Sequence, residues 1–218
     1  MEQSAKKTGK TYEMDMCSGA LFPKIVAFAV PLILSGILQL LFNAADIIVV
    51  GHFAGRESLA AVGSTTALIN LMINVFVGLS IGANVLVAQY SGAKKLKDLE
   101  ETVHTAMMIA LAGGFLLIFV GVFFSGPMRG LVGTPDDVLP LAALYLKIYF
   151  IGMPATLTYN FGAAILRAVG DTRRPLYFLL FAGAVNVVLN LVFVIVFSMG
   201  VAGVATATVV SECISAVL

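Results

Sequence analysis

The residues best suited to chemistry lie in a polar stretch, Ser35 to Gly51, within an apolar run over residues 25–50. Ser35, Gln39, Asn43 and Asp46 recur at i, i+4, i+8 and i+11, so a helix places them on one face. An ionisable group in hydrocarbon costs about 2.5 kcal/mol or more, and such groups usually face a protein interior or a water-filled path. Asp46 is therefore the first candidate for holding a proton or a cation.

The composition is that of a membrane protein. Hydrophobic residues make up 60% of the chain and charged residues 11%, against about 25% charged residues in soluble domains. The mean hydropathy is +1.01, and several apolar runs exceed the roughly 20 residues that span a bilayer. The sequence predicts an all-α integral membrane protein embedded in lipid.

Several other classes are disfavoured. The net charge of +1 does not indicate a nucleic-acid partner. The two cysteines, Cys17 and Cys213, have no metal-ligand spacing. Both histidines, His52 and His104, lie near the ends of predicted spans, which disfavours a nucleophile–base pair. We therefore expect no enzyme activity and no cofactor.

The hydropathy pattern predicts a polar tail over residues 1–20 followed by six spans. Pro31 and Pro154 each remove a backbone hydrogen bond, so each predicts a bend. The third span is the least polar and is expected to face lipid. The sixth runs to the last residue without a helix-stop signal, which suggests a fragment. The predicted spans are 24–50, 58–89, 102–124, 137–166, 176–198 and 201–218.

Basic residues in the connections predict the orientation. Ten fall on one side of a six-span arrangement and only Arg56 and Arg129 on the other. Lys and Arg concentrate on the cytoplasmic side, so the N-terminus is expected to be cytoplasmic, in the cytoplasmic (inner) membrane. The ten are Lys6, Lys7, Lys10, Lys24, Lys94, Lys95, Lys97, Arg167, Arg173 and Arg174.

Polar residues of four predicted spans share one depth. Asp46, Tyr145, Asn190 and Thr208 all fall roughly 6–12 Å below the outer membrane edge. Their hard oxygen ligands could bind Na⁺, or Asp46 could hold a proton. Alternatively, the amide and hydroxyl groups only form hydrogen bonds between helices.

Two further charged residues have open roles. Lys147 lies at a similar depth, where it could pair with Asp46 or extend to the outer interface. Glu212, one turn deeper than Thr208, is either a second titratable group or a carboxyl facing an absent part of the protein.

The chain resembles the multidrug and toxic compound extrusion (MATE) family, in its DinF-like branch, over about residues 20–218. The resemblance rests on three stretches in particular: PLILSGILQLLFNAADIIVVGHFAG from Pro31, FGAAILRAVGDTRRP from Phe161, and GVAGVATATVVSE from Gly200. It implies the N-terminal six-helix lobe of a twelve-helix transporter, with the second lobe missing from this chain. The implied function is a cation-coupled antiporter, driven by H⁺ or Na⁺, that exports small organic or cationic compounds.

The resemblance also implies residue roles. Asp46, Asn186, Asn190 and Thr208 match the family's N-lobe cation set, a possible Na⁺ site, with Tyr145 nearby, and Pro31 matches a hinge proline. Family members carry a second aspartate where this chain has Asn190, which favours exchange of a single proton. The residues expected to line the substrate cavity are Gln39, Asn43, Asn70, Asn74, Tyr149 and Asn160.

Two alternatives remain. A flippase of related fold for lipid-linked saccharides needs a strongly cationic cavity, and Lys147 is the only basic residue inside a predicted span. A non-catalytic membrane subunit, inactive without a second lobe, is the other.

Overall fold

The computed structural model describes residues 21–124 and 138–218, and these ranges contain helices and no strands. The predicted tail and the connection that carries Arg129 lie outside the described residues. Helices are the expected solution, because a helix satisfies its backbone hydrogen bonds internally where no water is available. The predicted all-α class is confirmed.

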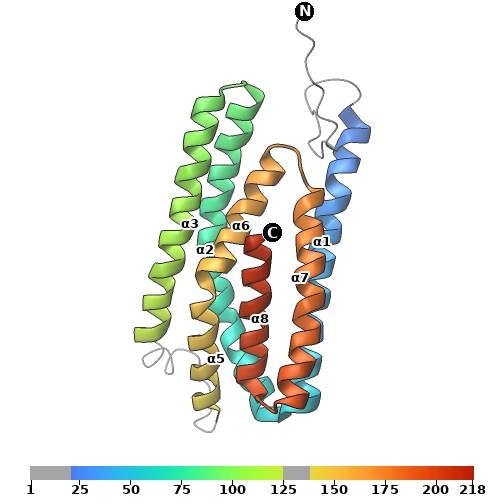
Figure 1. Ribbon diagram of the computed structural model, residues 1–218, viewed down its shortest axis with the longest axis vertical. Helices are drawn as coiled ribbons and strands as arrows, with labels where there is room; N and C mark the ends of the chain where they lie inside the picture. The colour runs from blue at the N-terminus through green and yellow to red at the C-terminus, as the bar shows by residue number, and fades with distance from the viewer. Residues whose placement is uncertain (1–20, 125–137) are drawn as a thin grey trace, which may run out of the picture.

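The helices run alternately up and down the bundle, with α5 and α6 following one another in the same direction (Figure 1). We call the end where α1 begins the amino end. The elements in order are α1 (Leu21–Val49), the π-helix η1 (Val50–Ala54), α2 (Gly55–Gly92), α3 (Leu96–Phe124), α5 (Leu139–Ile151), α6 (Met153–Ala168), α7 (Arg173–Leu191), the π-helix η2 (Val192–Val196) and α8 (Gly200–Val217).

Four helical segments are long and apolar enough to cross a membrane, and the bent pair α5–α6 is a fifth. The first segment, Phe22–Gly92, has 71 residues and contains both α1 and α2. The chain reverses between them at η1, next to Gly55 with its positive φ of 87° (Figure 1). The six predicted spans thus correspond to α1, α2, α3, the α5–α6 pair, α7 with η2, and α8.

The two prolines act differently. The axes of α5 and α6 meet at 51°, with Gly152 between them and Pro154 in the first turn of α6, so the bend predicted there is present. Proline is tolerated in a first turn because the N–H that it lacks would have no helical partner. α1, by contrast, continues as one helix through Pro31, whose carbonyl accepts a hydrogen bond from Ser35 Oγ at 2.8 Å.

The connections are shorter than predicted. Residues 51–57 remain helical, and α2 and α3 extend into the segment 90–101 that was predicted to be a connection. Lys95 pairs with Asp98 and Lys97 with Glu101, at spacings of three and four residues that stabilise a helix. The basic α2–α3 and α6–α7 connections both lie at the amino end, as the alternation requires (Figure 1).

A close contact holds α3 against the bend. A Cβ added at Gly114 would lie 2.4 Å from Pro154 Cα, too close for any side chain. Gly78 and Gly82 of α2 form a small-xxx-small pair that favours close helix packing. In the structure, however, no described atom outside α2 comes within 4 Å of a Cβ built at either position.

We predict that Gly114→Ala destabilises the bundle by about 1–3 kcal/mol, because the α6 backbone must move to make room. The matched control is Gly78→Ala, which adds the same methyl group to another helix interior without a contact. The measurement is the fraction of protein that elutes as a single species after heating in detergent. Equal losses for the two variants would contradict the prediction.

Candidate functional site

A polar cavity of about 450 Å³ lies inside the bundle. Residues of α1, α2, α5, α6, α7 and α8 line it, although most of the chain is apolar. Its polar lining residues are Ser35, Gln39, Asn43, Asp46, Asn70, Asn74, Tyr149, Thr156, Tyr159, Asn160, Arg167, Asn186, Thr208, Ser211, Glu212 and Ser215.

All six residues predicted for a substrate cavity belong to this lining. Gln39 and Asn43 of α1, and Asn70 and Asn74 of α2, are nevertheless exposed. The cavity is therefore open along the wall that α1 and α2 form.

The predicted cation set is brought together around Asn190. This fully buried side chain donates a hydrogen bond from Nδ2 to the Asp46 carboxylate and another, of 3.1 Å, to Asn186 Oδ1. Asn190 Oδ1 is buried and has no hydrogen-bond partner among the described residues. The site thus combines a carboxylate held by one amide with a free carbonyl oxygen.

Thr208 and Tyr145 lie near this group without bonding to it. Thr208 lines the same cavity, but its hydroxyl donates to Val204 O at 3.0 Å within α8. Tyr145 is buried outside the lining, and its ring centroid lies 5.9 Å from that of Tyr149. The geometry joins Asp46, Asn186 and Asn190 directly and leaves the other two residues as neighbours.

A tight contact sets the spacing of α1 and α7 beside Asp46. A Cβ at Gly183 of α7 would fall within 2.0 Å of the Phe42 ring. Phe42 precedes Asp46 by one helical turn, so the small residue lets α1 approach α7 closely enough for the Asp46–Asn190 bond.

One charged residue of the cavity, Arg167, was assigned differently from sequence. Arg167 was predicted to lie in a connection, yet it belongs to the last turn of α6 and lines the cavity. Arg167 follows Asn160 by seven residues, about two helical turns, and so lies on the same helix face. This spacing was the feature of the sequence that could have placed Arg167 in the cavity. Glu212 also lines the cavity.

Lys147 makes no ion pair with Asp46 in the described part of the chain. Its side chain is exposed on α5. The pairing considered from sequence is therefore not found.

Residues 78–82 read GLSIG, which matches the GxSxG pattern. In serine hydrolases this pattern forms a sharp turn between a strand and a helix. Here it lies in the middle of α2, and the Ser80 hydroxyl donates to Val77 O at 2.8 Å. The pattern does not form a nucleophile elbow.

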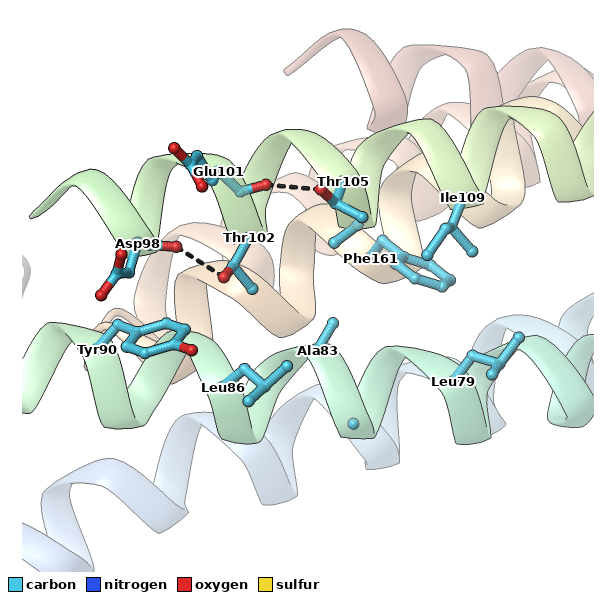
Figure 2. A pocket seen from close by; sticks show the side chains of 12 residues that line it. Leu79, Ala83, Leu86, Tyr90, Asp98, Glu101, Thr102, Thr105, Ile109 and Phe161 are labelled. Atoms are coloured by element: carbon cyan, nitrogen blue, oxygen red, sulfur yellow. Dashed lines mark hydrogen bonds between the residues drawn. The ribbon is translucent and has the colours of Figure 1, made fainter. Parts of the chain in front are cut away.

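A second hollow, of about 420 Å³, lies between α2 and α3 (Figure 2). Leu79, Leu86 and Ile109 are among its apolar walls. At its polar end, Asp98 and Glu101 have lysine partners and their carbonyls accept bonds from threonine hydroxyls. It contains none of the predicted site residues and is a weaker candidate.

Comparison with known proteins agrees with this arrangement. The MatE family model matches residues 31–192. The chain belongs to the MatE family. The resemblance to MATE transporters predicted from sequence is thereby confirmed, and this is a family of membrane transporters rather than enzymes.

The MATE relatives are longer proteins. The chain is 32% identical over 203 residues to the probable multidrug resistance protein YpnP of Bacillus subtilis, covering 92% of the chain and 45% of that protein. It is 20% identical to the multidrug export protein MepA of Staphylococcus aureus, covering 90% and 44%. The chain thus spans less than half the length of these relatives.

Solved MATE structures share the fold. One is a MATE in its bent conformation, with a TM-score of 0.82 and 26% identity over 91% of this chain and 44% of the other. Another is an outward-facing multidrug resistance MATE transporter, with a TM-score of 0.80 and 26% identity over 89% and 43%. The bundle therefore has the fold of part of a MATE transporter.

We predict that Asn190→Leu lowers stability by about 1–3 kcal/mol, because Asp46 loses its donor and stays in the bundle unpaired. The double variant Asp46→Leu/Asn190→Leu should recover part of the loss, since it removes both groups of the Asp46–Asn190 bond and leaves only Asn186 Oδ1 without its donor. Thermal unfolding in detergent, monitored by circular dichroism, measures the stability of both variants. A double variant less stable than Asn190→Leu would contradict the pairing.

Proposed function

We propose that the chain is the N-terminal lobe of a cation-coupled transporter that exports organic compounds across the cytoplasmic membrane. The observation that carries the proposal is a polar cavity, within an apolar bundle, that contains the carboxylate of Asp46. The names of the relatives, multidrug resistance and export proteins, support this class of substrate.

The coupling step is exchange of one proton at Asp46. The ionised carboxylate accepts a hydrogen bond from Asn190 Nδ2. A protonated Asp46 can instead donate its O–H to Asn190 Oδ1 after the amide rotates. This exchange changes the bond between α1 and α7, and α1 contains Pro31 as the proposed hinge.

A proton suits the site better than Na⁺. Among the described residues, Asp46 is the one carboxylate bonded to the Asn190 amide, which also donates to Asn186. If Na⁺ binds, Asp46, Asn186, Asn190 and Thr208 would supply its oxygen ligands, with less negative charge than a two-carboxylate site.

The orientation follows from charge. Lys94, Lys95, Lys97, Arg173 and Arg174 all lie at the amino end. We place this end in the cytoplasm, because basic residues favour that side. Asp46 then lies in the outer half of the membrane.

Charge in the cavity argues against a lipid-linked saccharide flippase. A pyrophosphate-bearing substrate needs a cationic site, and the described lining has one basic residue, Arg167, against Asp46 and Glu212. The sequence also predicted few basic residues inside the spans, which argues against a flippase, although it placed Arg167 in a connection.

We predict that Asp46→Asn reduces proton-driven dye export about tenfold or more, because the site can no longer exchange a proton. Export is measured in everted membrane vesicles from cells that co-express the chain with the C-terminal half of the Bacillus subtilis relative. The matched control is Asp98→Asn, which neutralises an acid outside the cavity and should retain full export.

Three outcomes would contradict the proposal. Full export by Asp46→Asn would rule out coupling at this carboxylate. Export by the chain alone would rule out the need for a second lobe, and no export with any second lobe would favour a non-transporting subunit.

A further inference from the structure

The hollow between α2 and α3, which we call the α2–α3 slot, is separate from the polar cavity, and no residue lines both (Figure 2). Its α2 wall runs from Tyr90 to Leu79, and its α3 wall runs from Asp98 to Ile109. Each wall extends about 16 Å along its helix. The slot is therefore long and narrow, and it follows the direction of the two helices.

The slot is closed toward the bundle and open on its outer side. Phe161 and Ala106 line it and are buried, whereas Leu79, Leu86 and Ile109 line it and are exposed. Both α2 and α3 belong to segments that are long and apolar enough to cross a membrane. The open side of the slot therefore faces the acyl chains of the bilayer.

A glycine keeps the slot free of side chains. Gly82 lines the slot, and no described atom outside its own helix comes within 4 Å of a Cβ built there. Gly82 therefore does not serve helix packing. Its lack of a side chain leaves room between the two walls for an apolar chain from outside the protein.

The slot changes from apolar to polar along its length. Tyr90 and Asp98 lie at one end, and Leu79 and Ile109 at the other (Figure 2). The polar end is the amino end of the bundle, because α2 finishes and α3 begins there. A slot with an apolar interior and a polar end at the membrane surface has the same polarity profile as a phospholipid.

The charges at the polar end match a headgroup that carries both signs. Residues 94–101 contain three lysines and three acidic residues, so this segment has no net charge. Asp98 lies in the first turn of α3, where the free N–H groups of the helix compensate its charge. Glu101 lines the slot less than one turn further on, and its only ion pair, with Lys97 at 4.0 Å, joins two largely exposed side chains. Such a pair is weak, so both partners are available to a ligand.

We propose that the α2–α3 slot binds phosphatidylethanolamine, with an acyl chain between the two helices, the ammonium on Glu101 and the phosphate beside Lys97. A primary ammonium donates three N–H groups, and hydrogen bonds from such a donor to a carboxylate are among the stronger ones. The quaternary ammonium of phosphatidylcholine has the same charge but no N–H to donate. This site goes beyond the proposed function, since it lies outside the polar cavity.

The test uses tryptophan fluorescence, because the chain contains no tryptophan of its own. The reporter is Met108→Trp, at an exposed position outside the lining, seven residues after Glu101 on the same helix face and about 10 Å along α3. The control reporter is Phe181→Trp, at an exposed position of α7. The full chain is reconstituted in bilayers of phosphatidylethanolamine and phosphatidylcholine, with brominated acyl chains on one lipid at a time. Quenching by each brominated lipid measures its relative affinity beside the reporter.

We expect the Met108→Trp reporter to show about a threefold preference for phosphatidylethanolamine, the size that one exposed charged contact provides. The Phe181→Trp reporter should show no preference, because it lies away from the slot.

Three further variants, each combined with Met108→Trp, assign the preference to the slot. Glu101→Gln should remove the preference, because the ammonium loses its charged acceptor. Gly82→Phe should remove it as well, because the ring fills the slot, and Gly82→Leu replaces this variant if it does not fold. The matched control is Glu57→Gln, which neutralises an exposed acid at the opposite end of α2 and should retain the preference.

Equal quenching by the two lipids at the Met108→Trp reporter would overturn the proposal, as would a preference that survives Glu101→Gln. The same preference at the Phe181→Trp reporter would also overturn it, because the lipid would then not be bound at the slot. Since this measurement needs no second lobe and no proton gradient, its outcome is independent of the export assay.

Discussion

The high cost of placing charge in hydrocarbon is the constraint on which this bundle depends. Asp46, Arg167 and Glu212 come from three different helices, and all three line one interior cavity. The lipid-facing surfaces are left to apolar side chains, as on α3, where Phe115, Phe119 and Phe123 are exposed. The helices are therefore arranged around a polar interior, in contrast to a soluble protein with its apolar core.

Small residues and one bend make that arrangement possible. Gly183 lets Phe42 and hence α1 approach α7, and Gly114 lets α3 approach the backbone at Pro154. The 51° change of direction between α5 and α6 allows Tyr149 on one segment and Asn160 on the other to line the same cavity. Glycines on α3 and α7 thus permit close helix contacts, while Gly78 and Gly82 have free space beside them.

The opening of the cavity and the greater length of the relatives point to the same conclusion. Gln39, Asn43, Asn70 and Asn74 are polar, exposed, and placed on the two helices that border the opening. The chain corresponds to about 44% of the solved MATE chains. A second lobe packed against this wall would complete the cavity, which is why the export experiment supplies one.

From the sequence alone, hydropathy predicted the helical class, and the resemblance of three stretches indicated the family. The spacing of polar residues in apolar runs pointed to six residues of the polar cavity, because that spacing records which helix face avoids lipid. Only the tertiary structure decided which of them touch. It showed that Asn190 bridges Asp46 and Asn186, that Thr208 bonds within its own helix, and that Lys147 does not pair with Asp46. It also moved Arg167 from a connection into the cavity, because helix ends depend on packing and capping that local hydropathy does not report.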